Sequence, residues 1–149
     1  MDLRPELLPP PVSPQRLEEL CREIDRISRL VTDRATDADE AIRTFNAVTG
    51  HDYTAHTFTW YWESRDLEDV AREAARPARP RVADITRDEL VEIVRRILAG
   101  DPETDYYLVL LEANVLHPRV TGLIFHPQDD NASAEEIIDE ALKYRPIAL

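Results

Sequence analysis

Helix-start and helix-stop signals recur along this chain, whereas the alternating apolar and polar pattern of half-buried strands is scarce. Ser13 followed by Pro14 is typical of a helix N-cap with proline at the first helical position. The sequences TRDE at 86–89 and SAEE at 133–136 have the spacing of capping boxes, in which the first and fourth residues satisfy each other's backbone amides. These signals predict an all-α fold.

In the first half of the chain, apolar residues recur at helical spacing between the signals. The predicted helices run from Ser13 through Val31, from Thr36 and Asp37 to Gly50, and from a cap at Ser64 through Ala74. The aromatic segment 52–64 fits either a short strand or a single helical turn. The segment 75–83 contains two prolines and is predicted to be an extended linker.

The second half is predicted to hold three helices and one short, irregular element. The helices run from Thr86 to Gly100, over 103–116 with Pro118 as the stop, and from Ser133 to Tyr144, and the irregular element over 120–125 is ended by Pro127. The order helix, helix, short segment, helix recurs in both halves, so an ancient duplication stays open.

Charge and composition exclude several classes of function. The net charge of −12 disfavours direct binding of nucleic acid and favours a basic protein partner. The longest apolar run, Tyr106 to Leu111, is too short to cross a membrane. Three glycines are too few for a glycine-rich phosphate loop. With no signal peptide in view and a single cysteine, Cys21, we expect a cytoplasmic protein.

The negative charge is concentrated in the second half. Ten acidic residues and one basic residue, Arg119, lie within residues 101–140. Four residues share one predicted helix face because they are spaced by four, three and four: Asp101, Asp105, Leu108 and Glu112. Two interpretations stay open. Either this face docks on a basic partner, or Leu108 belongs to the core and the acids only face solvent.

Two His-Pro pairs, His117-Pro118 and His126-Pro127, bracket the apolar segment 123–125. They fit a metal site, a helix stop or a docking surface. A metal cluster would have to recruit carboxylates from Glu112, Asp129 and Asp130. No HExxH or CxxC spacing accompanies the histidines, and no nucleophile motif is recognisable. We therefore expect neither an enzyme nor a metal or cofactor site.

Residues 84–145 resemble the immunity proteins of the nuclease colicins and S-type pyocins. The resemblance rests on motifs in a fixed order. These are a D-x-T-x-x-E helix start at 84–89, a glutamate five residues before His-Pro (Glu112 and His117-Pro118), a Leu-Ile-aromatic-x-Pro element at 123–127, an acidic turn, and a capped helix ending in Tyr144-Arg145.

The resemblance implies a four-helix fold with a very short third helix, and inhibitory binding to the cytotoxic nuclease of the producing cell. It also implies binding beside the nuclease centre by a protein that carries no catalytic group. The second helix would supply discriminating contacts and the third helix shared anchors. On this basis the predicted partner-binding residues are Asp101, Thr104, Asp105, Leu108, Val109 and Glu112 on the second helix, with Gly122, Phe125, His126 and Pro127 on the third.

The third helix departs from the family pattern. The family typically has an aspartate at the position of Gly122 and a tyrosine pair at Phe125 and His126, whereas Pro127 is retained. Phe125 keeps the contact area of an aromatic anchor. A buried anchor of this kind typically contributes about 2–4 kcal/mol to the binding free energy. His126 would make binding depend on pH near its ordinary pKa of about 6.5. The alternative is that Phe125 packs inward and His126 is only a surface residue.

We therefore predict an N-terminal helical module at 1–80 and a colicin-immunity-like four-helix domain at 82–149. The leading hypothesis is a bacteriocin immunity protein that inhibits a cognate nuclease through its acidic second-helix face and its third helix. The alternative is a helical protein-interaction or regulatory domain that keeps the fold without a toxin partner. The N-terminal module would dock on the same toxin, pack against the second domain, or mediate a weak homodimer.

Overall fold

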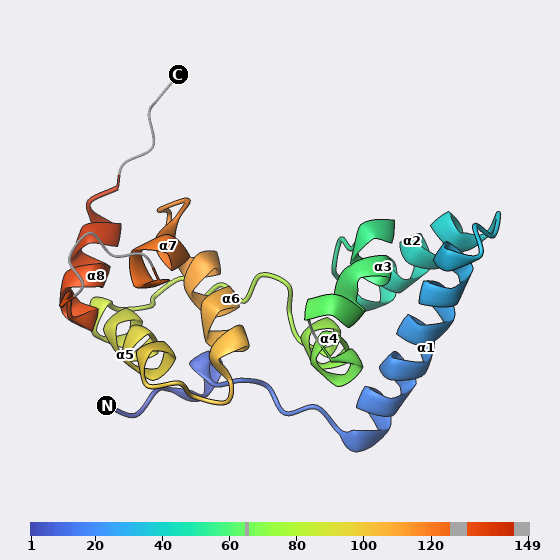
Figure 1. Ribbon diagram of the computed structural model, residues 1–149. Helices are drawn as coiled ribbons and strands as arrows, with labels where there is room; N and C mark the ends of the chain where they lie inside the picture. Colours follow the sequence, from blue (N-terminus) through green and yellow to red (C-terminus); the bar gives the residue numbers. More distant parts are fainter. Residues whose placement is uncertain (65, 126–130, 145–149) are drawn as a thin grey trace. The chain divides into compact units, whose positions relative to one another are not determined.

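The computed structural model describes residues 1–64, 66–125 and 131–144, and gives no side-chain description for 60–64. The described residues form eight α-helices and one short 3-10 helix, with no strand among them (Figure 1). The all-α prediction is confirmed. None of the described helices is both long and apolar enough to span a bilayer.

The chain divides into two compact units. Unit 1 comprises Met1–Pro9 and Arg79–Leu149, and unit 2 comprises Pro10–Ala78. The sequence analysis assigned all of 1–80 to one module, but the structure places the first nine residues with unit 1. The reason is that Leu3 and Leu7 are buried in the apolar core of that unit.

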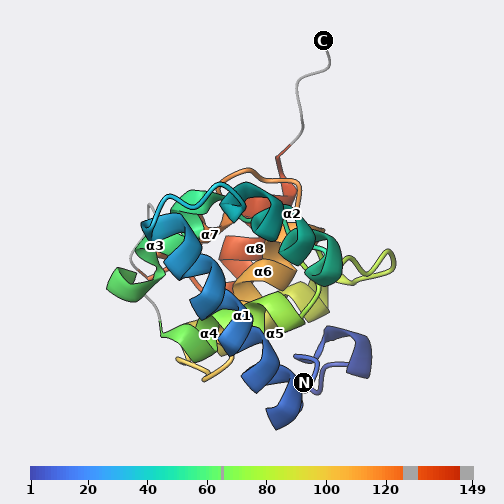
Figure 2. The same ribbon diagram turned by 90° about the vertical axis from the view of Figure 1, so that its right-hand side faces the viewer.

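Unit 2 is a bundle in which the first helix contacts each of the other three. Its helices are α1 (Pro14–Thr32), α2 (Ala38–Thr49), α3 (Ala55–Ser64) and α4 (Leu67–Ala75), as Figure 2 shows. Ser13 caps α1, because its Oγ accepts a hydrogen bond from the Arg16 amide at 3.1 Å. Gly50 ends α2 in the left-handed region, at φ 75°.

The aromatic segment of unit 2 is longer and more regular than the sequence analysis predicted. It forms the ten-residue helix α3. Phe58 on this helix is buried, and its carbonyl accepts a hydrogen bond from Ser28 Oγ on α1 at 2.9 Å. Ser64 therefore ends α3, and the prediction that it caps the next helix is wrong. Asp66 occupies the N-cap position of α4 instead.

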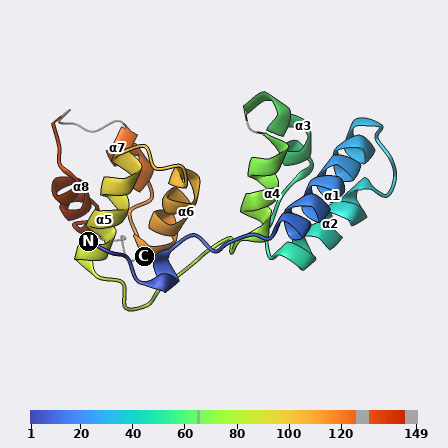
Figure 3. The same cartoon turned by 90° about the horizontal axis from the view of Figure 1, so that it is seen from below.

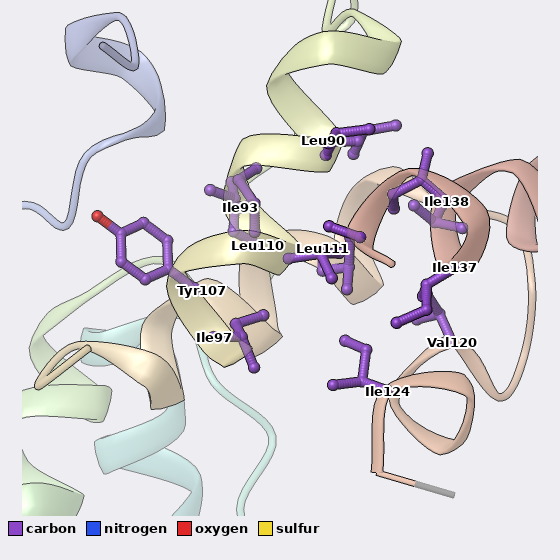
Figure 4. Packing of buried hydrophobic residues seen from close by; sticks show 14 of the residues in the cluster. Leu90, Ile93, Ile97, Tyr107, Leu110, Leu111, Val120, Ile124, Ile137 and Ile138 are labelled. Carbon is purple, nitrogen blue, oxygen red and sulfur yellow. The ribbon is translucent and has the colours of Figure 1, made fainter. Parts of the chain in front are cut away.

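Unit 1 has the predicted four helices with a very short third one, and this prediction is confirmed. They are α5 (Arg87–Leu98), α6 (Thr104–Asn114), α7 (Val120–Phe125) and α8 (Ala134–Leu142). Helix α5 packs against α6 and α8, and α7 packs against α6 and α8 (Figure 3). Figure 4 shows the apolar side chains that these helices contribute to one core: Leu90 and Ile93 from α5, Leu110 and Leu111 from α6, Ile124 from α7, and Ile137 and Ile138 from α8.

Two of the predicted helix caps of unit 1 are confirmed, and one predicted helix end is not. The capping box of α5 is complete: Thr86 Oγ1 accepts from the Glu89 amide at 3.2 Å, and Glu89 Oε1 accepts from the Thr86 amide at 2.9 Å. Ser133 caps α8 through the Glu136 amide. Helix α6 ends at Asn114, before the predicted Pro118 stop.

The side chain of Asn114 explains the earlier end of α6. Its Nδ2 donates to the carbonyl of Pro80 at 2.9 Å, and its Oδ1 accepts from the amide of Val82 at 2.8 Å. The end of α6 is thereby tied to the proline-containing segment that leads into α5.

The first nine residues, Met1–Pro9, are called the strap from here on. They include the 3-10 helix η1 (Pro5–Leu7), in which the Leu7 amide donates to the Arg4 carbonyl at 2.9 Å. Leu3 and Leu7 enter the core of unit 1, whereas Leu8 is exposed.

Candidate protein-binding surface

Helix α6 has a buried side and an accessible side. Tyr106, Tyr107, Leu110 and Leu111 are buried, and this side packs against α5 and α7. On the accessible side, Asp105 and Glu112 are exposed and lie two turns apart. Leu108 lies between them in the sequence. It is half-buried, because it packs against the core but keeps part of its side chain accessible. Val109 is also half-buried.

Asp105 and Glu112 have no cationic partner among the described residues. The acids of α8 differ, because Glu135, Asp139 and Glu140 form ion pairs with Arg95, Arg87 and Lys143, respectively. The hydrogen bond from Arg87 holds the pKa of Asp139 below its ordinary value. Three of the four acids of α8 thus have a cationic partner within unit 1, and the fourth, Glu136, is hydrogen-bonded to Ser133 at the helix start.

Asp101 and Thr104 form the turn that starts α6. Asp101 precedes the helix, and its Oδ1 accepts a hydrogen bond from the Glu103 amide at 2.7 Å. Its carbonyl accepts hydrogen bonds from the Thr104 amide at 3.0 Å and from Thr104 Oγ1 at 2.6 Å. Asp101 lies three residues before the first residue of α6, so it does not share a helix face with Asp105 as the spacing predicted.

Helix α7 presents one aromatic ring to solvent. Val120 and Ile124 point into the core, whereas Phe125 is 55% exposed. The alternative in which Phe125 packs inward is therefore wrong. Gly122 lies on the same short helix, and a Cβ atom there would meet only Arg119 Cβ, at 3.8 Å. The family's aspartate is thus not excluded by space at this position. His126 and Pro127 lie outside the described residues.

The turn between α6 and α7 adds a residue that the sequence analysis did not single out. Leu116 is 73% exposed. It follows Glu112 by four residues, but α6 ends at Asn114, so the helical spacing of Asp105, Leu108 and Glu112 does not extend to it. The name acidic–apolar surface is used from here on for five accessible residues of α6, the turn after it and α7: Asp105, Leu108, Glu112, Leu116 and Phe125.

His117 organises the same turn. Its Nδ1 accepts a hydrogen bond from the Arg119 amide at 3.0 Å, so the neutral ring carries its proton on Nε2. Its ring centroid lies 5.3 Å from that of Tyr144, just after α8. Within the ranges that the structure describes, no three His, Cys, Asp or Glu side chains gather as metal ligands would, and Asp129 and Asp130 lie outside those ranges.

A partly buried polar contact joins α5 to the core-facing side of α6. Nη1 of Arg96 on α5 donates to the Tyr107 hydroxyl at 2.9 Å, and its guanidinium carbon lies 5.7 Å from the Tyr107 ring centroid. Glu92 accepts from Arg96 Nε at 3.1 Å. The helical spacing of Tyr107 is typical of a core position, but spacing alone does not show where its phenol hydroxyl points.

Residues 82–146 match the model of a family described as colicin immunity protein / pyocin immunity protein. A Bacillus subtilis (strain 168) protein described as the uncharacterized protein YezA is 34% identical over 64 residues, which are 41% of this chain and 93% of that protein. This chain belongs to the colicin and pyocin immunity protein family. No solved structure matches it.

Family membership confirms the resemblance inferred from the motifs, and the match extends over α5, α6, α7 and α8. The acidic–apolar surface therefore lies wholly within the immunity-like part of unit 1. Immunity proteins of this family are inhibitors of toxins, not enzymes. The strap and unit 2 lie outside the matched residues.

Proposed function

We propose that this protein is a bacteriocin immunity protein that binds and inhibits a basic nuclease toxin in the cytoplasm of the producing cell. Family membership supports a toxin as the partner. The observation that carries the choice of surface is the absence of any cationic partner, among the described residues, for Asp105 and Glu112.

A nuclease is the kind of partner that such a surface fits. An enzyme that binds nucleic acid presents lysine and arginine side chains to the phosphates, so its surface near the catalytic centre is basic. Asp105 and Glu112 would attract that surface and speed encounter, because exposed complementary charges act mainly on the association rate. The same carboxylates would repel the phosphates of a nucleic acid substrate.

The apolar residues of the acidic–apolar surface would bury apolar area against the partner and so stabilise the complex. Aromatic residues in the centre of an interface contribute most when the partner desolvates them fully. Phe125 is accessible enough to be desolvated on binding, and Leu108 and Leu116 extend the apolar area on either side of Glu112 in sequence. Acids around an apolar centre also favour one partner over another, because a partner with an acid at the facing position is repelled.

Co-expression tests the proposal. The probe is the nuclease domain of a bacteriocin encoded beside this gene, expressed with the full chain in a sensitive host. We expect the wild-type chain to restore growth, and both Asp105→Lys and Glu112→Lys to lose protection. Glu140→Lys is the matched control, because Glu140 is an exposed acid of α8 that already pairs with Lys143. Equal protection by all three variants would contradict the α6 assignment.

A second candidate function is a protein-interaction domain that keeps the fold without a toxin partner. It is favoured by the replacement of the family's acid and tyrosine on α7 by Gly122 and Phe125. The neighbouring reading frame distinguishes the two functions. A neighbouring reading frame that encodes a basic nuclease domain supports immunity, and a neighbour of another kind supports the interaction domain.

A further inference from the structure

We infer that the strap is a built-in peptide ligand that completes the immunity-like unit, and that Pro10–Ala78 is a module inserted between this ligand and the family-matched region. The site that the strap occupies is formed by unit 1, mainly by α5 and the residues just before it. The inference does not depend on the proposed function, because it concerns what the unit needs in order to be stable.

Two apolar residues of the strap are part of the core of unit 1. Leu7 is fully buried at 0% exposure, and Leu3 is buried as well. Both belong to the same cluster as the core side chains of α5 and α6. The turn of η1 lets Leu3 and Leu7 enter the core while Leu8, the next residue, stays 39% exposed. A chain without the strap would expose the apolar surface that these two leucines cover.

The polar contacts of the strap compensate a buried charge. Glu89, the capping residue of α5, is only 8% exposed. Arg4 places Nε 2.9 Å from Glu89 Oε2, and its Nη2 donates to Glu89 Oε1 at 3.0 Å. Arg4 Nη1 also donates to Asp84 Oδ2 at 2.9 Å. Removing the strap would leave Glu89 buried without its cation, which is a costly arrangement in a protein interior.

The strap also reaches the residue that holds α6. The Met1 carbonyl lies 3.5 Å from Nη2 of Arg96, and Arg96 donates to the Tyr107 hydroxyl on α6. The strap thus contacts the inner support of the helix whose outer side carries Asp105 and Glu112. Its loss should therefore loosen α6 as well as α5.

The two ends of unit 2 lie close together. The comparison with the Bacillus protein gives unit 2 no counterpart, because the matched 64 residues make up 93% of that protein and leave too little of it for unit 2 or for the whole strap. In the present chain, both ends of unit 2 are fastened within that unit, because Arg76 Nε donates to the Pro10 carbonyl at 3.0 Å. Unit 2 therefore begins and ends at neighbouring points, as an inserted module does.

Amide hydrogen exchange of two full-length variants tests the inference. Leu7→Ala should speed exchange of the α5 and α6 amides by about tenfold or more, because it removes a buried leucine side chain. The amides of α1 to α4 should keep their rates. Leu8→Ala is the matched control and should change neither set. Unchanged α5 and α6 rates in Leu7→Ala, or faster exchange confined to α1–α4, would overturn the inference.

Cleavage of the first linker gives a second test. A site-specific protease sequence placed after Pro11 in the full chain would separate the strap from unit 2 after folding. Native mass spectrometry should then show the strap peptide still bound to the rest of the chain. The same cut in a Leu7→Asp variant should release it. Release from the wild-type chain with no change in α5 and α6 exchange would contradict a role as ligand.

Discussion

Nε of Arg4 lies 2.9 Å from Oε2 of Glu89, so a residue outside the family-matched region neutralises the buried acid that caps α5. This contact joins the two segments of unit 1 that unit 2 separates in the sequence. It also sets a dependence of stability on pH that can be measured.

Glu89 should make the stability of unit 1 sensitive to acid. Burial raises the pKa of Glu89, but hydrogen bonds from Thr86 and Arg4 outweigh burial and leave the pKa below its ordinary value of 4.5. Because the folded-state pKa is the lower one, this stabilisation is fully present above about pH 4.5 and is lost as the pH falls through the folded-state pKa. Glu89→Gln should lower the free energy of unfolding at pH 7 and flatten its decline in acid.

Urea unfolding followed by circular dichroism at a series of pH values measures this effect. Asp88→Asn is the control, because Asp88 is an exposed acid in the same first turn of α5. It should leave the acid-dependent loss of stability in place. If Glu89→Gln and wild type lost stability in parallel below pH 4.5, the Arg4–Glu89 contact would not be the source.

Neighbouring residues of α7 should separate binding from stability. Phe125→Ala should change the free energy of unfolding by less than about 0.5 kcal/mol, because the ring is largely exposed. It should still weaken nuclease binding by about 2 kcal/mol or more if the ring is an anchor. Ile124→Ala should instead destabilise the fold by about 2–5 kcal/mol, because Ile124 is buried. A Phe125→Ala protein with unchanged affinity would remove Phe125 from the interface.

Asp105 and Glu112, which have no cationic partner in the part of the chain that the structure describes, should act on the rate of association. Asp105→Lys and Glu112→Lys should each slow association with the nuclease domain by about tenfold or more at low salt, because they reverse a steering charge. The difference from wild type should shrink as ionic strength rises, because exposed charges are screened. Stopped-flow measurements at several salt concentrations give both results. A deficit that persists unchanged in high salt would indicate a packing defect instead of lost steering.

Gly122 should be replaceable without strain. Gly122→Ala should raise the free energy of unfolding by about 0.5–1 kcal/mol, because glycine inside a helix is disfavoured and the added Cβ meets nothing closer than 3.8 Å. Gly122→Asp restores the family's usual acid and should also fold. Thermal unfolding of the two variants checks this, and a lower melting temperature for Gly122→Ala would show that the glycine is needed.

The local signals for helices carried most of the fold prediction. The capping box at Thr86 and Glu89 and the glycine stop at Gly50 depend on residues close in sequence, so they could be read directly. Ser64 was misread because a serine is compatible with the end of one helix as well as the start of the next. What decided between the two was the burial of Phe58, a contact between α3 and α1 that spacing does not reveal.

The candidate surface was only partly accessible to sequence reasoning. Asp105, Leu108 and Glu112 lie at helical spacing within α6 and are each at least partly accessible, and their role in binding stays a prediction. Asp101 did not join them, because its carboxylate is used in the turn before the helix. The strap was missed altogether. Its leucines lie among prolines, and its partner Glu89 is distant in the sequence, so no local pattern joined them.

Isothermal titration of the full-length chain into the nuclease domain encoded beside its gene tests the central proposal most directly. We expect a one-to-one complex that the wild-type chain forms tightly, and that Asp105→Lys, Glu112→Lys and Phe125→Ala each weaken while Glu140→Lys does not. A titration without heat and without a complex by gel filtration would contradict the assignment of this protein as a nuclease inhibitor.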